Sequence, residues 1–160
     1  MEKKYILSVL VRNHEGVLVR IAGLLTRRFF NIISIVAAET ENPEITQIII
    51  VAQGNEQIIG QVQVQLDKLV DILHVEVLDR DTSVVREHLL IKLRAQLNQM
   101  GPLVDVVNMF KASILDVTGD TVILELTGDN HTLDSFIAIL KPYETLKMIR
   151  TGCSAMARGQ

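Results

Sequence analysis

The sequence predicts an α+β protein built from two ferredoxin-like βαββαβ sandwiches, each with helices on one face of an antiparallel sheet. Three observations carry this prediction. Apolar strand-like runs and amphipathic stretches follow the order strand, helix, strand, strand, helix, strand, and this order occurs twice. A strand, then Gly-Asn or Gly-Asp, then a helix recurs at Gly54 and Gly128. A polar break at residues 79–83 separates the copies, and so we expect domains at residues 1–79 and 84–160.

The elements of the first copy follow from apolar spacing and from turn residues. Pro43 bars a sheet ladder inside the hairpin turn at residues 41–44, and Asn55 is expected to cap the second helix. The predicted strands are residues 4–11, 32–38, 45–52 and 71–77. The first helix is predicted at residues 16–28, with the apolar positions Val17, Ile21, Leu24 and Leu25. The second helix has the predicted apolar face Ile58, Val62, Leu66 and Leu69.

The second copy begins again with a strand after the polar break. Gly101 and Pro102 introduce its first helix, which runs through Phe110, and Pro142 ends its second helix. The predicted strands are residues 88–93, 112–117, 121–126 and 146–150, followed by a small, polar tail from 151 to 160. The predicted helix faces are Leu103, Val104, Val107 and Phe110, and then Leu133, Phe136, Ile137 and Leu140.

Composition narrows the function classes. Of the 160 residues, 48% are hydrophobic and the net charge is −3, and these values indicate a globular domain without a basic face for nucleic acid. The pair Arg27 and Arg28 is more simply the cationic last turn of a helix. The single cysteine, Cys153, excludes an internal disulfide. No apolar run approaches the ~20 residues of a membrane span, and we expect a cytoplasmic protein.

The turn at residues 13–18 is the first candidate binding site. Gly16 stands at the mouth of the first predicted helix, where the N–H groups of Gly16, Val17 and Leu18 could hold a carboxylate. Asn13 could accept a hydrogen bond from an ammonium group. An ordinary helix start, with Asn13 or His14 as the cap, explains the same residues equally well, and both interpretations stay open here.

The second candidate site is Asn31 with Ile32, directly after the first helix. Asn31 either ends that helix in the left-handed conformation, or it binds a polar ligand beside the apolar wall of Ile32. The four histidines show no metal-ligand spacing, and no pair of carboxylates or nucleophile with a base is apparent. We therefore predict no catalytic residue and no metal site. The strands are apolar on both faces, which favours dimerisation through sheet edges or helices.

The residues of the first candidate site belong to a longer pattern. Residues 5–21 combine an apolar strand, the motif N-x-x-G-x-L-x-R from Asn13 to Arg20, and a helix, and this pattern resembles the opening of an ACT domain. The resemblance becomes more specific with the stretches 69–75, 86–92, 114–118 and 150–159. Together they are similar to the small regulatory subunits of acetolactate synthase (acetohydroxyacid synthase), over nearly the whole chain.

This resemblance implies a non-catalytic subunit. Such a subunit binds and activates a large catalytic subunit, and confers feedback inhibition by valine or another branched-chain amino acid. Thiamine diphosphate, FAD and Mg are then expected on the catalytic subunit only, and no cofactor is expected in this chain. The effector would lie in a homodimer, between Asn13, Gly16, Val17 and Leu18 of one protomer and Asn31 and Ile32 of the other. The second copy has residues 94–100 in place of the glycine turn. We expect it to serve assembly and contact with the catalytic subunit.

Two other functions remain open at this point. One is a free-standing ACT-type amino-acid sensor for a different partner, which would not co-purify with a thiamine diphosphate enzyme. The other is a small enzyme of the acylphosphatase kind, with Arg12 and either Asn13 or Asn31 in the active site. The turn lacks the glycine-rich phosphate cradle of such an enzyme.

Overall fold

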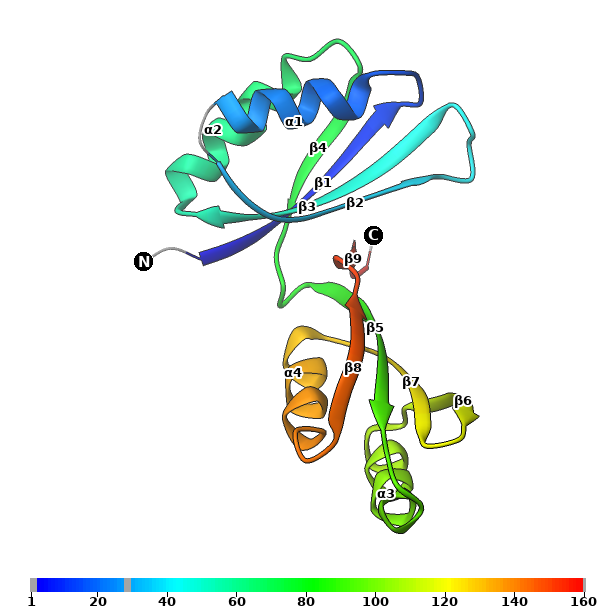
Figure 1. Cartoon of the computed structure of the whole chain (residues 1–160). Helices are drawn as coiled ribbons and strands as arrows, with labels where there is room; N and C mark the ends of the chain where they lie inside the picture. Colours follow the sequence, from blue (N-terminus) through cyan, green and yellow to red (C-terminus); the bar gives the residue numbers. More distant parts are fainter. Residues whose placement is uncertain (1–2, 28–29, 160) are drawn as a thin grey trace. The chain divides into compact units, whose positions relative to one another are not determined.

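The computed structural model describes residues 3–27 and 30–159, and it divides into two compact units (Figure 1). The first unit comprises the chain up to Val84 together with the tail from Gly152 onward, and the second is Val85–Thr151. The tail therefore groups with the first unit, whereas the sequence placed residues 84–160 together. The break between the two halves falls directly after the predicted polar stretch.

The first unit is a four-stranded antiparallel sheet with two helices, as predicted. The strand order is β2-β3-β1-β4, so β2 and β4 form the edges. Helices α1 and α2 lie on the same face of the sheet (Figure 1). Arg28, which the sequence placed in the first helix, lies outside the described residues. The elements are β1 (Lys3–Arg12), α1 (Val17–Arg27), β2 (Asn31–Glu39), β3 (Ile45–Gly54), α2 (Glu56–Asp67) and β4 (Ile72–Leu78).

The core of the first unit lies between the sheet and these helices. It combines alternate residues of β1 and β3 with the apolar stripe of α1, because a strand presents every second side chain to one face. In α2 the structure corrects the predicted face, since Ile59 is buried whereas Ile58 is only half-buried. Asn55 caps α2 as predicted, and its Oδ1 accepts from the N–H of Ile58 at 2.9 Å. The buried core residues are Leu7, Val9, Val11, Val17, Ile21, Leu25, Ile48, Ile50, Ala52, Ile59, Val62, Leu66 and Val75.

The second unit repeats the same topology. Its strand order is β6-β7-β5-β8, which matches β2-β3-β1-β4 strand for strand. Asp129 caps α4 by accepting from the N–H of Thr132 at 2.7 Å, just as Asn55 caps α2. The elements are β5 (Ser83–Arg94), the 3-10 helix η1 (Leu97–Gln99), α3 (Met100–Phe110), β6 (Ser113–Thr118), β7 (Thr121–Gly128), α4 (Asn130–Ile139) and β8 (Glu144–Arg150). The predicted fold class of two ferredoxin-like sandwiches is confirmed.

The core of the second unit joins β5 and β7 to the helices α3 and α4. The rings of Phe110 and Phe136 lie with their centroids 5.1 Å apart, in a tilted aromatic pair. The predicted face of α3 is wrong at Val104, which is exposed, whereas Val106 packs against the core. The buried residues are Leu89, Ile91, Leu93, Ala95, Leu103, Val107, Val122, Leu124, Leu126, Leu133, Phe136 and Leu140.

The C-terminal tail contains a strand that the sequence does not predict. β9 (Ser154–Ala157) pairs with β5, and the N–H of Arg158 donates to the carbonyl of Thr82 at 2.8 Å. At Gly152 the tail lies so close to β2 that a Cβ there would meet Cγ2 of Val36 at 2.6 Å. Cys153 and Ala155 are buried. The small residues of the tail are thus explained by close packing against the first unit.

Helices of the described residues are all too short or too polar to cross a membrane.

Candidate functional site

The candidate turn connects the end of β1 to the start of α1. Gly16 has φ +83°, which a residue with a side chain rarely adopts, and no atom lies within 4 Å of where its Cβ would be. The turn is exposed, and Leu18 in the first turn of α1 is 46% exposed, while Val17 is buried in the core. The position of Gly16 thus combines a left-handed backbone with open space.

No side chain in the described part of the chain accepts from the N–H groups of Val17 and Leu18, in contrast to the capped starts of α2 and α4. Asn13 does not cap α1, because its Nδ2 donates to the carbonyl of Pro43 at 2.8 Å and to Glu39 at 3.1 Å. Its backbone N–H donates to the carbonyl of Glu44 at 2.7 Å. The start of α1 therefore presents uncapped N–H groups to its surroundings.

His14 makes a contact that the sequence did not predict. Its Nε2 lies 2.7 Å from Oδ1 of Asp71, and Nη1 of Arg20 donates to Oδ2 of Asp71 at 2.6 Å. Asp71 is buried in the turn before β4, with only 5% of its surface exposed. One signal in the sequence was a lone acidic residue between apolar neighbours, but its partners lie far away along the chain.

The second candidate pair begins β2. Nδ2 of Asn31 donates to Gln53 at 3.2 Å on the neighbouring strand β3. Among the described residues, only Lys111 has a positive φ without being glycine, so Asn31 does not end α1 in the left-handed conformation. Ile32 is half-buried and packs against the core of the first unit. Asn31 is exposed and available at the edge of the sheet.

One protomer does not bring the two candidate patches together. Asn31 begins β2, whereas Asn13 bonds to Glu39 at the end of the same strand. Nine residues of strand separate those ends, which corresponds to roughly 25–30 Å. A single amino acid is far too small to touch both patches within one chain.

A shallow depression adjoins the candidate turn. It has a volume of about 450 Å³ and mixes cationic, acidic, amide and apolar groups. Its lining residues are Arg12, Asn13, His14, Asn42, Glu44, Ile45 and Leu73. This mixture suits a small zwitterion better than a purely apolar or a polyanionic ligand.

The second unit is built differently at the corresponding place. After β5, the N–H of Ala95 donates to the carbonyl of Asp120 at 2.8 Å, and η1 follows before α3. The N–H of Gln96 donates to Oε1 of Gln99 at 2.9 Å, which closes this start with a side chain. No glycine with positive φ stands there. The second unit therefore has no counterpart of the Gly16 turn.

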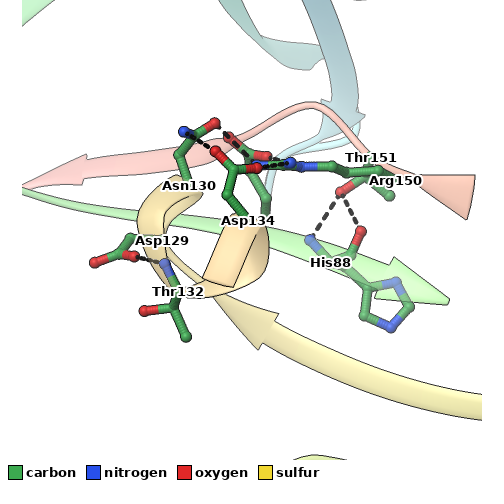
Figure 2. Close-up of polar contacts among 8 residues, drawn as sticks. His88, Asp129, Asn130, Thr132, Asp134, Arg150 and Thr151 are labelled. Carbon is green, nitrogen blue, oxygen red and sulfur yellow. Dashed lines mark hydrogen bonds and ion pairs between the residues drawn. The ribbon is translucent and has the colours of Figure 1, made fainter. Parts of the chain in front are cut away.

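The most connected polar cluster of the second unit centres on Arg150 (Figure 2). Its guanidinium donates to Glu87 at 2.6 Å, to Asp134 at 2.6 Å and to Asn130 at 2.9 Å. Burial lowers the pKa of Arg150, but the hydrogen bonds to Asp134 and Glu87 outweigh it, and the pKa is raised. The cluster joins β5, β8 and the start of α4, and its donors are engaged within the protein.

Two further polar contacts lie close to this cluster (Figure 2). Oγ1 of Thr151 accepts from the N–H of His88 at 3.0 Å and donates to its carbonyl at 3.4 Å (Figure 2). The backbone N–H of Thr151 donates to the same carbonyl at 3.0 Å. The hydrogen bond from the Thr132 backbone N–H holds the pKa of Asp129 below its ordinary value. Within the described residues, no group of three or more His, Cys, Asp or Glu side chains could hold a metal ion.

Two ferredoxin-like units, the first opening with a glycine turn into α1, define a protein of the ACT-domain class. A family model described as an AHAS small subunit-like ACT domain matches residues 7–74, and one described as the small subunit of acetolactate synthase matches residues 86–159. The chain belongs to the family of acetolactate synthase small subunits.

Individual relatives agree with the family models. The chain is 39% identical to a probable acetolactate synthase small subunit of Archaeoglobus fulgidus, over 98% of each chain. It is 34% identical to the acetolactate synthase small subunit of Mycolicibacterium smegmatis, over 96% of this chain and 90% of that one. The crystal structure of the acetolactate synthase small subunit from Thermotoga maritima superposes with a TM-score of 0.92, at 33% identity and with 99% of each chain covered.

Proposed function

We propose that this chain is the regulatory subunit of an acetolactate synthase. In this proposal it binds the large catalytic subunit, raises its activity, and transmits feedback inhibition by valine or a related branched-chain amino acid. The reaction, with its thiamine diphosphate, FAD and Mg, belongs to the large subunit. The cytoplasmic location expected from the sequence remains a prediction.

The observation that carries the proposal is the uncapped start of α1 beside Gly16. An amino-acid carboxylate is an anion, and N–H groups at a helix start, together with the helix dipole, favour anions. Because Nδ2 of Asn13 is engaged by Pro43 and Glu39, its Oδ1 is the atom left to accept from the ligand's ammonium group. Leu18, which is 46% exposed, supplies apolar contact for a branched side chain, whereas buried Val17 offers only its backbone N–H.

The separation of the two patches supports a site shared by two protomers. Since Asn31 and Ile32 lie at the other end of β2 from Asn13, they complete the site only on a second copy of the chain. Effector binding would then change the free energy of one dimer arrangement relative to another. A coupling of about 1–3 kcal/mol to the catalytic subunit is typical of such regulation.

The first test is thermal unfolding of the purified chain with each common amino acid in turn. At a hundredfold excess over its dissociation constant, a ligand adds about 2.7 kcal/mol to the free energy of unfolding. We expect this to raise Tm by roughly 5–10 °C for valine, leucine or isoleucine alone.

Activity of the catalytic subunit with and without the chain then measures activation and inhibition. If the chain changes neither the activity of the catalytic subunit nor its inhibition, the proposal is wrong.

Gly16→Asp tests the site itself. The new carboxylate would occupy and repel the position of the effector carboxylate, and we expect loss of inhibition. The matched control is Gly119→Asp, because Gly119 also has a positive φ, at +62°, with open space around it. Both variants place an aspartate on a left-handed backbone. Full inhibition of the Gly16→Asp variant would remove the turn from the proposed site.

A further inference from the structure

We infer that Asp71 is a positioning residue for the proposed effector site. Its carboxylate holds the turn before α1 and the second turn of α1 together, and so directs the N–H groups at the start of that helix. This inference rests on the proposed function, because it concerns the same site. Asp71 acts through other residues, since it is too buried to touch a ligand that lies on the exposed turn.

Burial makes the pairing of Asp71 stringent. Among the described residues, it is the only Asp, Glu, Lys, Arg or His side chain in the buried class. A buried carboxylate is unfavourable unless its oxygens are paired, and here each oxygen has a different partner. Oδ1 lies 2.7 Å from Nε2 of His14, and Oδ2 lies 2.6 Å from Nη1 of Arg20. Loss of either contact would therefore leave one oxygen of a buried carboxylate unpaired.

The two partners of Asp71 flank Gly16 in the chain. His14 precedes the glycine, and Arg20 follows it by one helical turn, where its N–H donates to the carbonyl of Gly16 at 3.0 Å. The backbone carbonyl of Asp71 also accepts from the N–H of Arg12 at 2.9 Å. Gly16 itself has no Cβ to pack and no atom near that position. The conformation of the turn is thus determined by the anchored residues on both sides.

The second anchor of the turn is separate from Asp71. It consists of the hydrogen bonds from Asn13 to Pro43 and Glu44 in the hairpin between β2 and β3. Asn13 alone would hold the turn from the hairpin side only. With Asp71 in place, the turn is held from the hairpin side and from the β4 side, and the ligand meets a site that is already formed.

The experiment uses the full chain and two exposed partners of Asp71, so that folding is retained. Arg20→Gln and His14→Gln each remove one contact, and Arg20→Lys keeps a cation that can reach Asp71. Arg80→Gln is the matched control, because Arg80 is exposed and lies in the segment after β4. Valine, leucine and isoleucine are the ligands, measured by titration calorimetry, with Tm recorded for each variant.

We expect Arg20→Gln to raise the dissociation constant about tenfold, which is the effect of losing one charge-assisted hydrogen bond. Arg20→Lys should restore part of that affinity, and Arg80→Gln should leave it unchanged. The double variant Arg20→Gln with Asp71→Asn should bind no more weakly than Arg20→Gln alone. A purely structural role of these residues would lower Tm and leave the dissociation constant of the folded chain unchanged.

Amide hydrogen exchange gives a readout without any ligand. If Asp71 positions the turn, Arg20→Gln and His14→Gln should speed exchange at residues 14–18, relative to Arg80→Gln. The inference is overturned if the wild-type chain binds a branched-chain amino acid and Arg20→Gln shows the same affinity and the same exchange. The proposed function would still stand in that case. Absence of binding in the wild-type chain, alone and with the catalytic subunit, would overturn both.

Discussion

The two units have the same topology, but they differ where the first strand meets the first helix. In the first unit, β1 leads through a short turn with Gly16 into α1, whose start is capped by no side chain of the described residues. In the second unit, β5 leads into the short helix η1, whose start is closed by Gln96 and Gln99, and α3 follows directly from η1. Elsewhere the units use the same device, since Asn55 and Asp129 cap the equivalent helices α2 and α4 in the same way.

This comparison separates fold from function. The features shared by both units, namely alternating strands, capped second helices and an apolar core, are those required to build the sandwich. The feature found in one unit only is the open turn, and that is where we place ligand binding. A duplicated fold can thus keep its stabilising contacts in both copies and retain a site in one.

The units also differ in the contacts that hold an edge strand of the sheet. The second unit has the Arg150 cluster, in which one guanidinium joins two strands to the start of a helix. The first unit instead has the tail, which packs closely against the edge strand β2 at Gly152. One unit therefore depends on charge pairing and the other on close packing.

Arg150→Met should have the largest effect on stability. It leaves Glu87, whose side chain is 14% exposed, without its partner, and we expect a loss of about 2–4 kcal/mol in the free energy of unfolding. Arg94→Met is the control, because Arg94 pairs with the exposed carboxylates of Asp120 and Glu144. An exposed pair should contribute less than about 1 kcal/mol. Denaturant unfolding of both variants measures the difference, and equal losses would remove the distinction.

Gly152→Ala should have the next largest effect. The added methyl group meets Cγ2 of Val36, and overpacking of this kind costs about 1–3 kcal/mol. Thermal unfolding of the single variant and of the pair with Val36→Ala tests this. Removing Cγ2 of Val36 should recover part of the lost stability. If Gly152→Ala is as stable as the wild type, the tail does not pack as closely as described.

Asn55→Ala and Asp129→Ala should have smaller and similar effects. Each removes the hydrogen bond that satisfies one N–H at a helix start, at a cost of about 1 kcal/mol. Denaturant unfolding at neutral pH measures both. A large difference between the two variants would show that the repeated caps do not contribute equally.

Lowering the pH should weaken the stabilising effect of the Asp129 cap but not that of the Asn55 cap. This is the smallest effect that we predict. The pKa of Asp129 is lower in the folded state than in the unfolded state. The ionised carboxylate therefore stabilises the fold at any pH above the pKa of the unfolded state. This contribution is lost as the pH falls through the pKa of the folded state. Asn55 does not titrate. Below about pH 4 the difference in Tm between wild type and Asp129→Asn should therefore shrink, while the effect of Asn55→Ala stays constant. A difference that is independent of pH would contradict the assignment of Asp129 as an ionised cap.

Some contacts were predictable because their partners are close in sequence. The side chain of Asn55 reaches an N–H three residues ahead, and Gly119 takes a positive φ inside a short hairpin turn. Helical and alternating periods likewise express the geometry of one element. The predicted helix faces were wrong at Ile58 and Val104 although most of their other positions were correct. Neighbouring residues of a helix differ in direction by about 100°, and packing decides which of them is buried.

The sequence by itself determined the order of elements, the helix cap at Asn55 and the position of the glycine turn, since each depends on residues within a few positions of one another. Only the tertiary structure decided that Asp71 pairs with His14 and Arg20, which lie 57 and 51 residues away. It also decided that the tail packs on the first unit. Contacts of this kind depend on how the antiparallel sheet brings distant turns together, and no local pattern in the chain records that approach.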